Sequence, residues 1–294
     1  MLHFSLRRRL PDLTATALLA LWLGAATHAN AVPRAGEGAA EKAGGGGGFN
    51  HVEPASDEAE EAISQIKVPA GFKVELFAAE PLLANPVAFH IDEQNRFYVV
   101  ETFRRKVAVI DIRNVMHWLD DDLASRTVAA RNEMVKKFMQ PPDLAMMTKP
   151  SEQLRLIEDR DGDGKADFSS VFSKNHNRME DGIAAGVLAR NGDVYYANIP
   201  SLWRLRDKDG DGVEDVRDEL HYGYGVRYAF VGHDLHGLRF GPDGKLYFSI
   251  GDRGLHVDKT PDGHRISNPD SGAVMRCNPD GTELEIIHTG LRNP

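Results

Sequence analysis

The sequence is poor in cysteine, in long apolar runs and in blocks of like charge. Its single cysteine, Cys277, excludes an internal disulfide, and the lack of a CxxCH motif excludes a haem attached to this chain. A net charge of −9 without a basic run argues against a nucleic-acid partner. What remains, 41% hydrophobic and 27% charged residues over 294 positions, is a globular composition with room for one large or two small domains.

Residues 1–31 have the order of segments that is typical of a secretory signal peptide. A basic start, MLHFSLRRRL, precedes the apolar stretch TATALLALWLGAA, and the small residues Ala29–Ala31 follow. The apolar stretch is too short to span a bilayer. We therefore predict export to the periplasm or cell envelope. Twin-arginine export through Arg7–Arg9 and an uncleaved anchor are the alternatives.

Residues 32–65 are rich in glycine, alanine and glutamate, as in RAGEGAAEKAGGGGG. Such a segment buries too little apolar surface to offset the entropy lost on ordering, which predicts a disordered linker. The folded part, residues 66–294, is expected to begin near Ile66.

A strand–turn–strand pattern recurs in the folded part at Ala88–Glu101, Gly186–Asn198 and Gly237–Asp252. A second recurring unit, LRLIEDRDGDGKADFSSVF, has a close copy in LWRLRDKDGDGVEDVRDEL, 48 residues further on, and a weaker one in VMRCNPDGTELEII. Two hairpins per period make four strands, which is the spacing of a β-propeller blade. The sequence thus predicts an all-β fold of four-stranded blades.

Residues 112–148 interrupt this pattern. Asn114–Gln140 contains no glycine or proline and carries an apolar stripe of helical spacing, which predicts a helical insertion within a blade. About four blades would then fit between Val68 and Pro294. Since closed propellers of this kind usually need more, we expect the sequence to be part of a longer chain.

Two turns of the second unit are acidic and share the spacing D-x-D-x-D-G-x-x-D. Alternate carboxylates around a glycine turn can converge on one hard cation, so the loops predict structural Ca²⁺ sites; a solvated acidic turn is the alternative. The flanking segments read as strands, which excludes a helical EF-hand. The candidate ligands are Asp159, Asp161, Asp163 and Asp167 in one loop and Asp207, Asp209, Asp211 and Asp215 in the other.

Two histidines stand where the other copies of the hairpin have small or apolar residues. His233 aligns with Ala84 and about Gly182, and His236 aligns with Val87 and Ala185. In a propeller this position lies at the mouth of the central channel, where ligands bind. The alternatives for His233 are a hydrogen-bonded structural histidine and a transition-metal ligand.

We also predict contacts for the two acidic residues near these histidines, Asp234 and Asp252. Asp234 is placed to orient the ring of His236, which would make His236 a structural residue. Asp252 and Arg253, adjacent in GDRG, are expected to form an ion pair with each other in a turn.

The stretch HDLHGLRFGPDGKLYFSIGDRG, followed by GAVMRCNPDGTELEIIHTGLRNP, resembles the soluble quinoprotein glucose/sorbosone dehydrogenase superfamily. More narrowly, it resembles a membrane-bound dehydrogenase family whose longer members often end in a haem-binding domain. The resemblance covers about Ile66 to Pro294. HDLHG departs from the H-x-G-G form common in the glucose enzymes, which leaves altered substrate, a metal site or lost activity open.

The resemblance implies a six-bladed propeller that holds pyrroloquinoline quinone (PQQ) over its channel. The family's general base stands eight residues before the G-P-D turn, which is His233 here, and its R-N cofactor contacts are Arg292 and Asn293. His236 is a further candidate at the cofactor site. The implied function is oxidation of a sugar or polyol, with electrons passing to a haem-binding domain or a cytochrome c.

Two other functions remain compatible with the sequence. A non-catalytic propeller could bind a glycan or a protein segment in its channel. A calcium-stabilised structural array would need the acidic loops but no special histidines.

Overall fold

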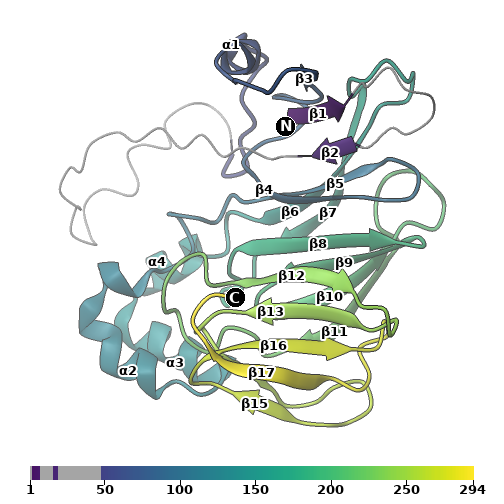
Figure 1. Ribbon diagram of the computed structural model, residues 1–294. Helices are drawn as coiled ribbons and strands as arrows, with labels where there is room; N and C mark the ends of the chain where they lie inside the picture. The colour runs from purple at the N-terminus through teal and green to yellow at the C-terminus, as the bar shows by residue number, and fades with distance from the viewer. Residues whose placement is uncertain (1, 7–15, 19–47) are drawn as a thin grey trace.

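The computed structural model describes residues 2–6, 16–18 and 48–294, and three antiparallel four-stranded sheets follow one another along the chain (Figure 1). The first sheet consists of β4 (Pro86–Ile91), β5 (Phe97–Glu101), β6 (Glu152–Glu158) and β7 (Phe168–His176). The second consists of β8 (Ala184–Arg190), β9 (Asp193–Asn198), β10 (Ser201–Arg206) and β11 (Val216–Tyr222). The third consists of β12 (Leu235–Phe240), β13 (Leu246–Ile250), β16 (Gly272–Cys277) and β17 (Glu285–Leu291).

Each sheet is a meander in which successive strands pair with their neighbours. A short hairpin, β14 (Leu255–Val257) with β15 (Ile266–Asn268), interrupts only the third sheet, between its second and third strands. The recurring hairpins of the sequence form the first two strands of each sheet, and the acidic-turn units form strands three and four. This confirms the all-β prediction and the four-stranded unit.

Strands of the third sheet place alternate side chains in the core, whereas a strand between two packed sheets such as β5 is buried at every position. In β13, Leu246, Phe248 and Ile250 enter the core between the second and third sheets, while Tyr247 points the other way and is half-buried. A separate core, which includes Leu156, Phe172 and Tyr196, joins the first and second sheets.

The first strands of the three sheets lie side by side, with β8 in contact with both β4 and β12. Gly186 on β8 makes the approach to β12 possible. A Cβ at that position would lie 2.5 Å from Leu238 Cδ1 and 3.2 Å from the Cα of His236. The starts of the three strands are therefore brought to one region of the molecule.

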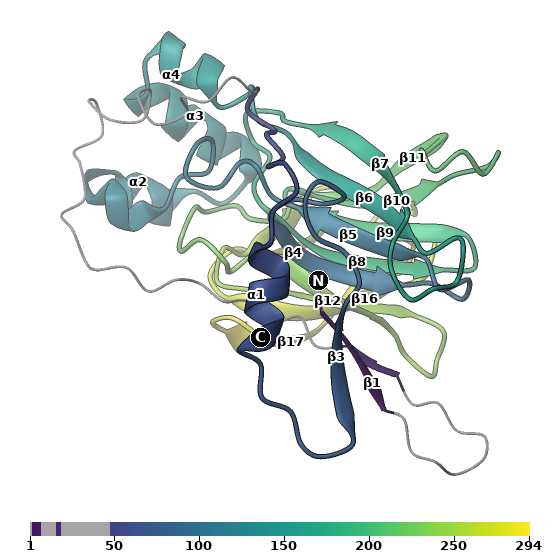
Figure 2. The same cartoon turned by 90° about the horizontal axis from the view of Figure 1, so that it is seen from above.

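The helices between β5 and β6 lie where an insertion was predicted and group at one side of the sheets in both views (Figures 1 and 2). Two 3-10 turns, Ile112–Asn114 and Met116–Trp118, lead into α2 (Leu119–Ala124), α3 (Val128–Phe138) and α4 (Pro141–Met146). Their core includes Trp118, Met134, Val135 and Tyr228, so it reaches the segment that precedes β12.

Residues before β4 cover the outer face of the first sheet. Phe77 stacks on Phe97 with ring centroids 4.2 Å apart, and Leu83 joins the same core. Helix α1 (Glu58–Ser64) lies inside the predicted linker, and β3 (Phe72–Leu76) follows it.

The predicted signal peptide lies mostly outside the described residues. Within it the structure describes β1 (Leu2–Leu6) and β2 (Thr16–Leu18), which pair with each other while β1 also pairs with β3. Of the helices in the described part, none is long and apolar enough to cross a membrane.

The number of four-stranded sheets in the described part is three, where the sequence predicted about four blades. The difference has two physical causes. The helices occupy chain length that a blade would need. Of the residues before β4, some cover the first sheet and β3 joins β1 and β2 in a three-stranded sheet, so the described residues form no fourth four-stranded sheet.

Candidate functional site

His233 lies just before β12 and forms a close pair with Asp252, which follows β13. Its Nδ1 lies 2.6 Å from Asp252 Oδ1, and its side chain is only 9% exposed. A carboxylate at this distance favours the tautomer with a proton on Nδ1, which leaves Nε2 as an acceptor. The hydrogen bonds of the described residues include none to His233 Nε2.

Phe230 lies beside His233, with ring centroids 5.5 Å apart, and two arginines pack over the Phe230 ring. Arg113, from the helical insertion, has its guanidinium carbon 5.1 Å from the ring centroid, and that of Arg292 lies at 5.4 Å. The carbonyl of Arg292 also accepts from the Asp252 amide at 2.7 Å. The structure therefore brings together His233 and Arg292, which the sequence predicted from separate motifs.

Asp111 fixes the orientation of Arg113 in this group. Its carboxylate accepts from Arg113 Nε at 2.9 Å and from Nη2 at 2.6 Å. The same contacts, above all the hydrogen bond from the Arg113 side chain, lower the pKa of Asp111. The insertion thus helps to build the surroundings of His233.

Asp234 pairs with Arg253 and not with a histidine. Both side chains are buried, and Arg253 Nη1 donates to Asp234 Oδ1. The expected Asp252–Arg253 ion pair and the expected role of Asp234 at His236 are both wrong. Both predictions paired residues that are close in the sequence. In the structure Asp252 and Asp234 each contact a residue on the other side of the β12–β13 hairpin, His233 and Arg253 respectively.

The remaining predicted cofactor residues are more open. His236 lies on β12 and is half-buried, and its backbone faces Ser249 of β13. Asn293 is exposed at the end of the chain.

A pocket of about 810 Å³ lies where the first strands of the three sheets begin. Gly232 and Asp234, on either side of His233, line it, and so do Ala84, Val87 and Ala185, which the repeat aligns with the two histidines. His233 itself is not among the lining residues. The full lining is Phe49, His51, Glu53, Glu80, Ala84, Asn85, Pro86, Val87, Thr102, Phe103, Arg105, Lys106, Ile183, Ala185, Val231, Gly232 and Asp234.

A buried carboxylate holds the rim of this pocket in place. Glu152 accepts from Thr102 Oγ1 at 3.0 Å, from the amides of Phe103 and Arg104 at 3.1 and 2.9 Å, and from Ala184 N at 3.0 Å. Burial raises the pKa of Glu152 to about 7. These bonds tie the turn after β5 to the start of β8, so the pocket has a rigid frame on that side.

The two acidic loops adopt the same hydrogen-bond pattern. Asp159 accepts from the amides of Gly162 and Gly164 at 2.8 and 2.9 Å, and Asp207 accepts from those of Gly210 and Gly212 at 2.7 and 2.9 Å. Each loop brings three carboxylates to within 4.8 Å of one another: Asp159, Asp161 and Asp163 in the first, and Asp207, Asp209 and Asp215 in the second.

The other two predicted ligands hold backbone amides. Asp167 accepts from Arg160 N and Asp211 from Val213 N, each at 2.8 Å.

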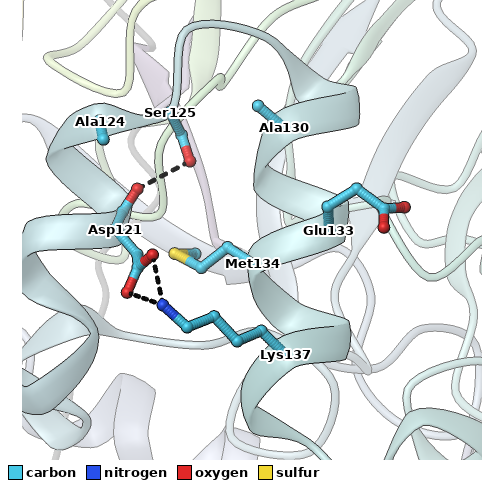
Figure 3. A pocket seen from close by; sticks show the side chains of 7 residues that line it. All are labelled: Asp121, Ala124, Ser125, Ala130, Glu133, Met134 and Lys137. Atoms are coloured by element: carbon cyan, nitrogen blue, oxygen red, sulfur yellow. Dashed lines mark hydrogen bonds and ion pairs between the residues drawn. The ribbon is translucent and has the colours of Figure 1, made fainter.

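A smaller pocket of about 350 Å³ lies between α2 and α3 (Figure 3). Lys137 bridges it by pairing with both oxygens of Asp121 at 2.8 Å, and Met134 supplies an apolar wall. It shares no lining residue with the large pocket.

These observations define a mostly β protein of antiparallel four-stranded sheets with a pocket of mixed polar and apolar lining at the strand starts. Residues 58–293 match the family described as "Domain of unknown function (DUF7133)", and the chain belongs to that family. Comparison with curated proteins gives no match.

A solved structure described as "unknown function protein" from Dyadobacter fermentans DSM 18053 is 13% identical with a TM-score of 0.33. The similarity covers 68% of this chain and 41% of that one, so the chain spans about two fifths of its length.

Sequence reasoning missed several residues of the site. Asp252 as the partner of His233, Phe230 with Arg113 around it, and the segment from Phe49 to Glu53 come from distant parts of the chain. Of these, only Asp252 could have been predicted from the sequence. HDLHG begins the β12–β13 hairpin and GDRG ends it, so the two motifs must lie side by side.

Proposed function

We propose that this chain is the propeller part of an exported, PQQ-dependent dehydrogenase that oxidises a hydroxyl group of a sugar or polyol. The observation that carries the proposal is the His233–Asp252 pair, 2.6 Å apart and next to the large pocket. An imidazole that is oriented by a carboxylate, and whose second nitrogen has no hydrogen bond among the described residues, is suited to general-base chemistry.

The propeller itself is part of this proposal. Three consecutive four-stranded meanders, with first strands β4, β8 and β12 side by side, support it. In a ring of such sheets the first strands line the central channel, and the large pocket would be the channel's mouth.

The chemistry that this chain supplies centres on His233. Nε2 would take the proton of the substrate hydroxyl as the C–H hydride leaves. Asp252 would keep the Nδ1 proton in place and stabilise the imidazolium that forms. The packing of Phe230 against the ring limits its rotation.

The cationic side chains near the pocket fit a tricarboxylate cofactor. Arg105 and Lys106 line the pocket and are exposed, and Arg292 lies over Phe230 beside His233. Arginine suits a carboxylate or an o-quinone because its planar fork donates two parallel hydrogen bonds. When bound, PQQ supplies the hydride acceptor.

Electrons would then pass to a haem-binding domain or a cytochrome c. Residues 1–31 support an exported location by their composition. Two structural Ca²⁺ ions in the acidic loops complete the proposal. Their donor sets fit, because each loop offers three carboxylates that can reach one ion.

A binding module is the second candidate. The observation that favours it is the apolar character of much of the pocket lining near His233, including Val231, Ile183 and Ala185. Such a surface suits retention of a ligand without a reaction.

The His233→Ala variant tests the proposal. We expect the full chain with PQQ and Ca²⁺ to reduce an artificial electron acceptor in the presence of D-glucose or D-sorbitol. Loss of the base should lower kcat by about 10²–10⁴-fold. Asp252→Asn should also lower kcat, while His264→Ala, at a 69% exposed side chain, should not.

The measurement is the initial rate of acceptor reduction, with melting temperatures to verify folding. Absence of turnover in the wild-type chain, or equal rates in wild type and His233→Ala, would favour the binding module.

A further inference from the structure

The segment Phe49–Glu53 forms one wall of the large pocket, although it lies in the predicted linker. Phe49, His51 and Glu53 all line the pocket. Asn50, which lies between Phe49 and His51, does not line the pocket. Its side chain anchors the segment to Ser151. Its Nδ2 donates to the carbonyl of Ser151 at 2.7 Å, and its Oδ1 accepts from the Ser151 amide at 3.0 Å.

The anchor joins the segment to the rigid frame of the pocket. Ser151 precedes Glu152, whose carboxylate holds the turn at Thr102–Arg104 and the start of β8. Ser151 Oγ also accepts from the amide of His176 at 3.0 Å. The side-chain amide of Asn50 makes two hydrogen bonds to this frame, and together they fix the residues on either side of Asn50.

The anchored segment presents an aromatic ring and a polar pair to the pocket. Phe49 is 42% exposed, and Phe103 lines the same pocket. His51 Nε2 lies 3.4 Å from Glu53 Oε2. An exposed ring beside hydrogen-bonding groups is suited to a ligand that has one apolar face and a polar rim.

The charged residues that line the pocket indicate which charge such a ligand should have. Glu53 and Glu80 are balanced by Arg105 and Lys106, and Asp234 is paired with Arg253. With Arg105 and Lys106 bound to the carboxylates of the proposed cofactor, Glu53 and Glu80 remain to accept hydrogen bonds from hydroxyl groups, which favours a neutral, hydroxyl-rich ligand over a second anion.

We infer that Phe49–Glu53 is the substrate-facing wall of the pocket, with Phe49 as a platform for the C–H face of a sugar ring. His51 and Glu53 bind hydroxyl groups at the edge of that ring. This inference rests on the proposed function for its choice of sugar as substrate class, but it concerns binding and not the chemical step.

The test measures the dissociation constant of D-glucose by titration calorimetry on the full chain. Phe49→Ala should raise Kd by about 3- to 10-fold, the range expected for loss of one ring contact. Phe49→Trp should restore tight binding. Asn50→Ala should raise Kd to a similar extent because the wall is released.

Asn177→Ala is the matched control, because Asn177 Nδ2 also donates to a backbone carbonyl, that of Thr148, at 2.8 Å, and does not line the pocket. Its Kd should equal that of the wild type.

Limited chymotrypsin digestion gives a readout independent of turnover. Cleavage after Phe49 should be faster in Asn50→Ala than in Asn177→Ala, and glucose should slow it in the wild type. Unchanged cleavage in Asn50→Ala would contradict the anchoring role.

The outcomes separate the inference from the proposed function. Wild-type glucose affinity in both Phe49→Ala and Asn50→Ala, or no glucose binding by the wild type, overturns the inference whatever the turnover. Glucose binding that depends on Phe49, in a chain without dehydrogenase turnover, supports the inference and counts against the dehydrogenase.

Discussion

His176 and His233 are both buried, but their surroundings differ in charge. Ser173 Oγ lies 2.7 Å from His176 Nε2, and Arg217 and Arg178 are the charges that act on its ring. Burial, together with these arginines, lowers the pKa of His176 to about 3. His233 instead contacts the carboxylate of Asp252. His176 is therefore held neutral, as a structural residue at the end of β7.

The pKa of His176 predicts a loss of stability at mildly acidic pH. The unfolded chain takes up a proton on this histidine below about pH 6.5, whereas the folded chain does so only near pH 3. The free energy of unfolding should therefore fall as pH falls, by about 1 kcal/mol from this group between pH 6.5 and 5.5. His176→Gln should be less stable at pH 7.5 but lose less on acidification.

Urea unfolding at pH 7.5 and 5.5 measures both quantities. His264→Gln is the control, because its side chain is 69% exposed and its removal should leave the pH dependence unchanged. The assignment fails if wild type and His176→Gln lose equal stability on acidification.

At the scale of elements, the helical insertion is held to the sheets by buried charged side chains. Arg131 on α3 is 1% exposed and donates to the carbonyl of Gly225 and, at 2.7 Å, to that of Glu180. Asp122 on α2 accepts from the amide of Tyr228 at 2.8 Å. Since residues 224–232 lead into His233, the insertion supports the segment on which the proposed base stands.

Replacing Arg131 should loosen this contact. Arg131→Met keeps most of the volume but leaves two buried carbonyls without donors, each at a cost of about 1–3 kcal/mol. Hydrogen exchange should accelerate in residues 119–138 and 224–232, and the melting temperature should fall.

Lys136→Met, at an exposed position of the same helix, is the matched control. Equal exchange rates in the two variants would show that the helices are held by their apolar core alone.

At the scale of the whole molecule, the second acidic loop links the second sheet to the first. Ser170 Oγ on β7 donates to the carbonyl of Gly212 in the second loop at 2.6 Å, and the amide of Glu214 donates to Phe172 O at 3.0 Å. The second loop therefore rests on the first sheet. A cation that orders this loop would also stabilise the contact between two sheets.

Ca²⁺ should accordingly raise the stability of the whole chain. At a concentration of 100 times Kd, one bound ion adds about 2.7 kcal/mol. For a domain of this size that corresponds to roughly 5–10 °C in Tm. Chelation with EDTA should remove the gain, and Asp161→Asn or Asp209→Asn should each reduce it.

Asp57→Asn is the control, since Asp57 lies outside both loops and makes no side-chain capping bond at α1. Differential scanning calorimetry with and without Ca²⁺ provides the measurement. An identical Tm in both conditions for the wild type would leave the loops as solvated turns.

Much of the fold could be predicted from local pattern. The β12–β13 hairpin around Pro242-Asp243-Gly244 and the paired acidic turns follow from alternation and turn residues, which act within a few positions of the chain. The helices between β5 and β6 could be predicted because the spacing of apolar residues changes there from the alternation of a strand to the repeat of a helix. The number of four-stranded sheets did not follow, because the local pattern does not say that residues 77–83 will cover the first sheet or that β3 will pair with β1.

The candidate site divides in the same way. By itself the sequence determined that His233 and His236 are exceptional among the repeats, whereas the grouping of Arg292 with them came from the family resemblance. Only the tertiary structure decided that Asp252 holds His233, that Asp234 pairs with Arg253 and not with His236, and that Phe49 lines the large pocket nearby. Period and spacing are local properties of the chain. Which carboxylate meets which imidazole depends on how two strands pair and on what packs behind them.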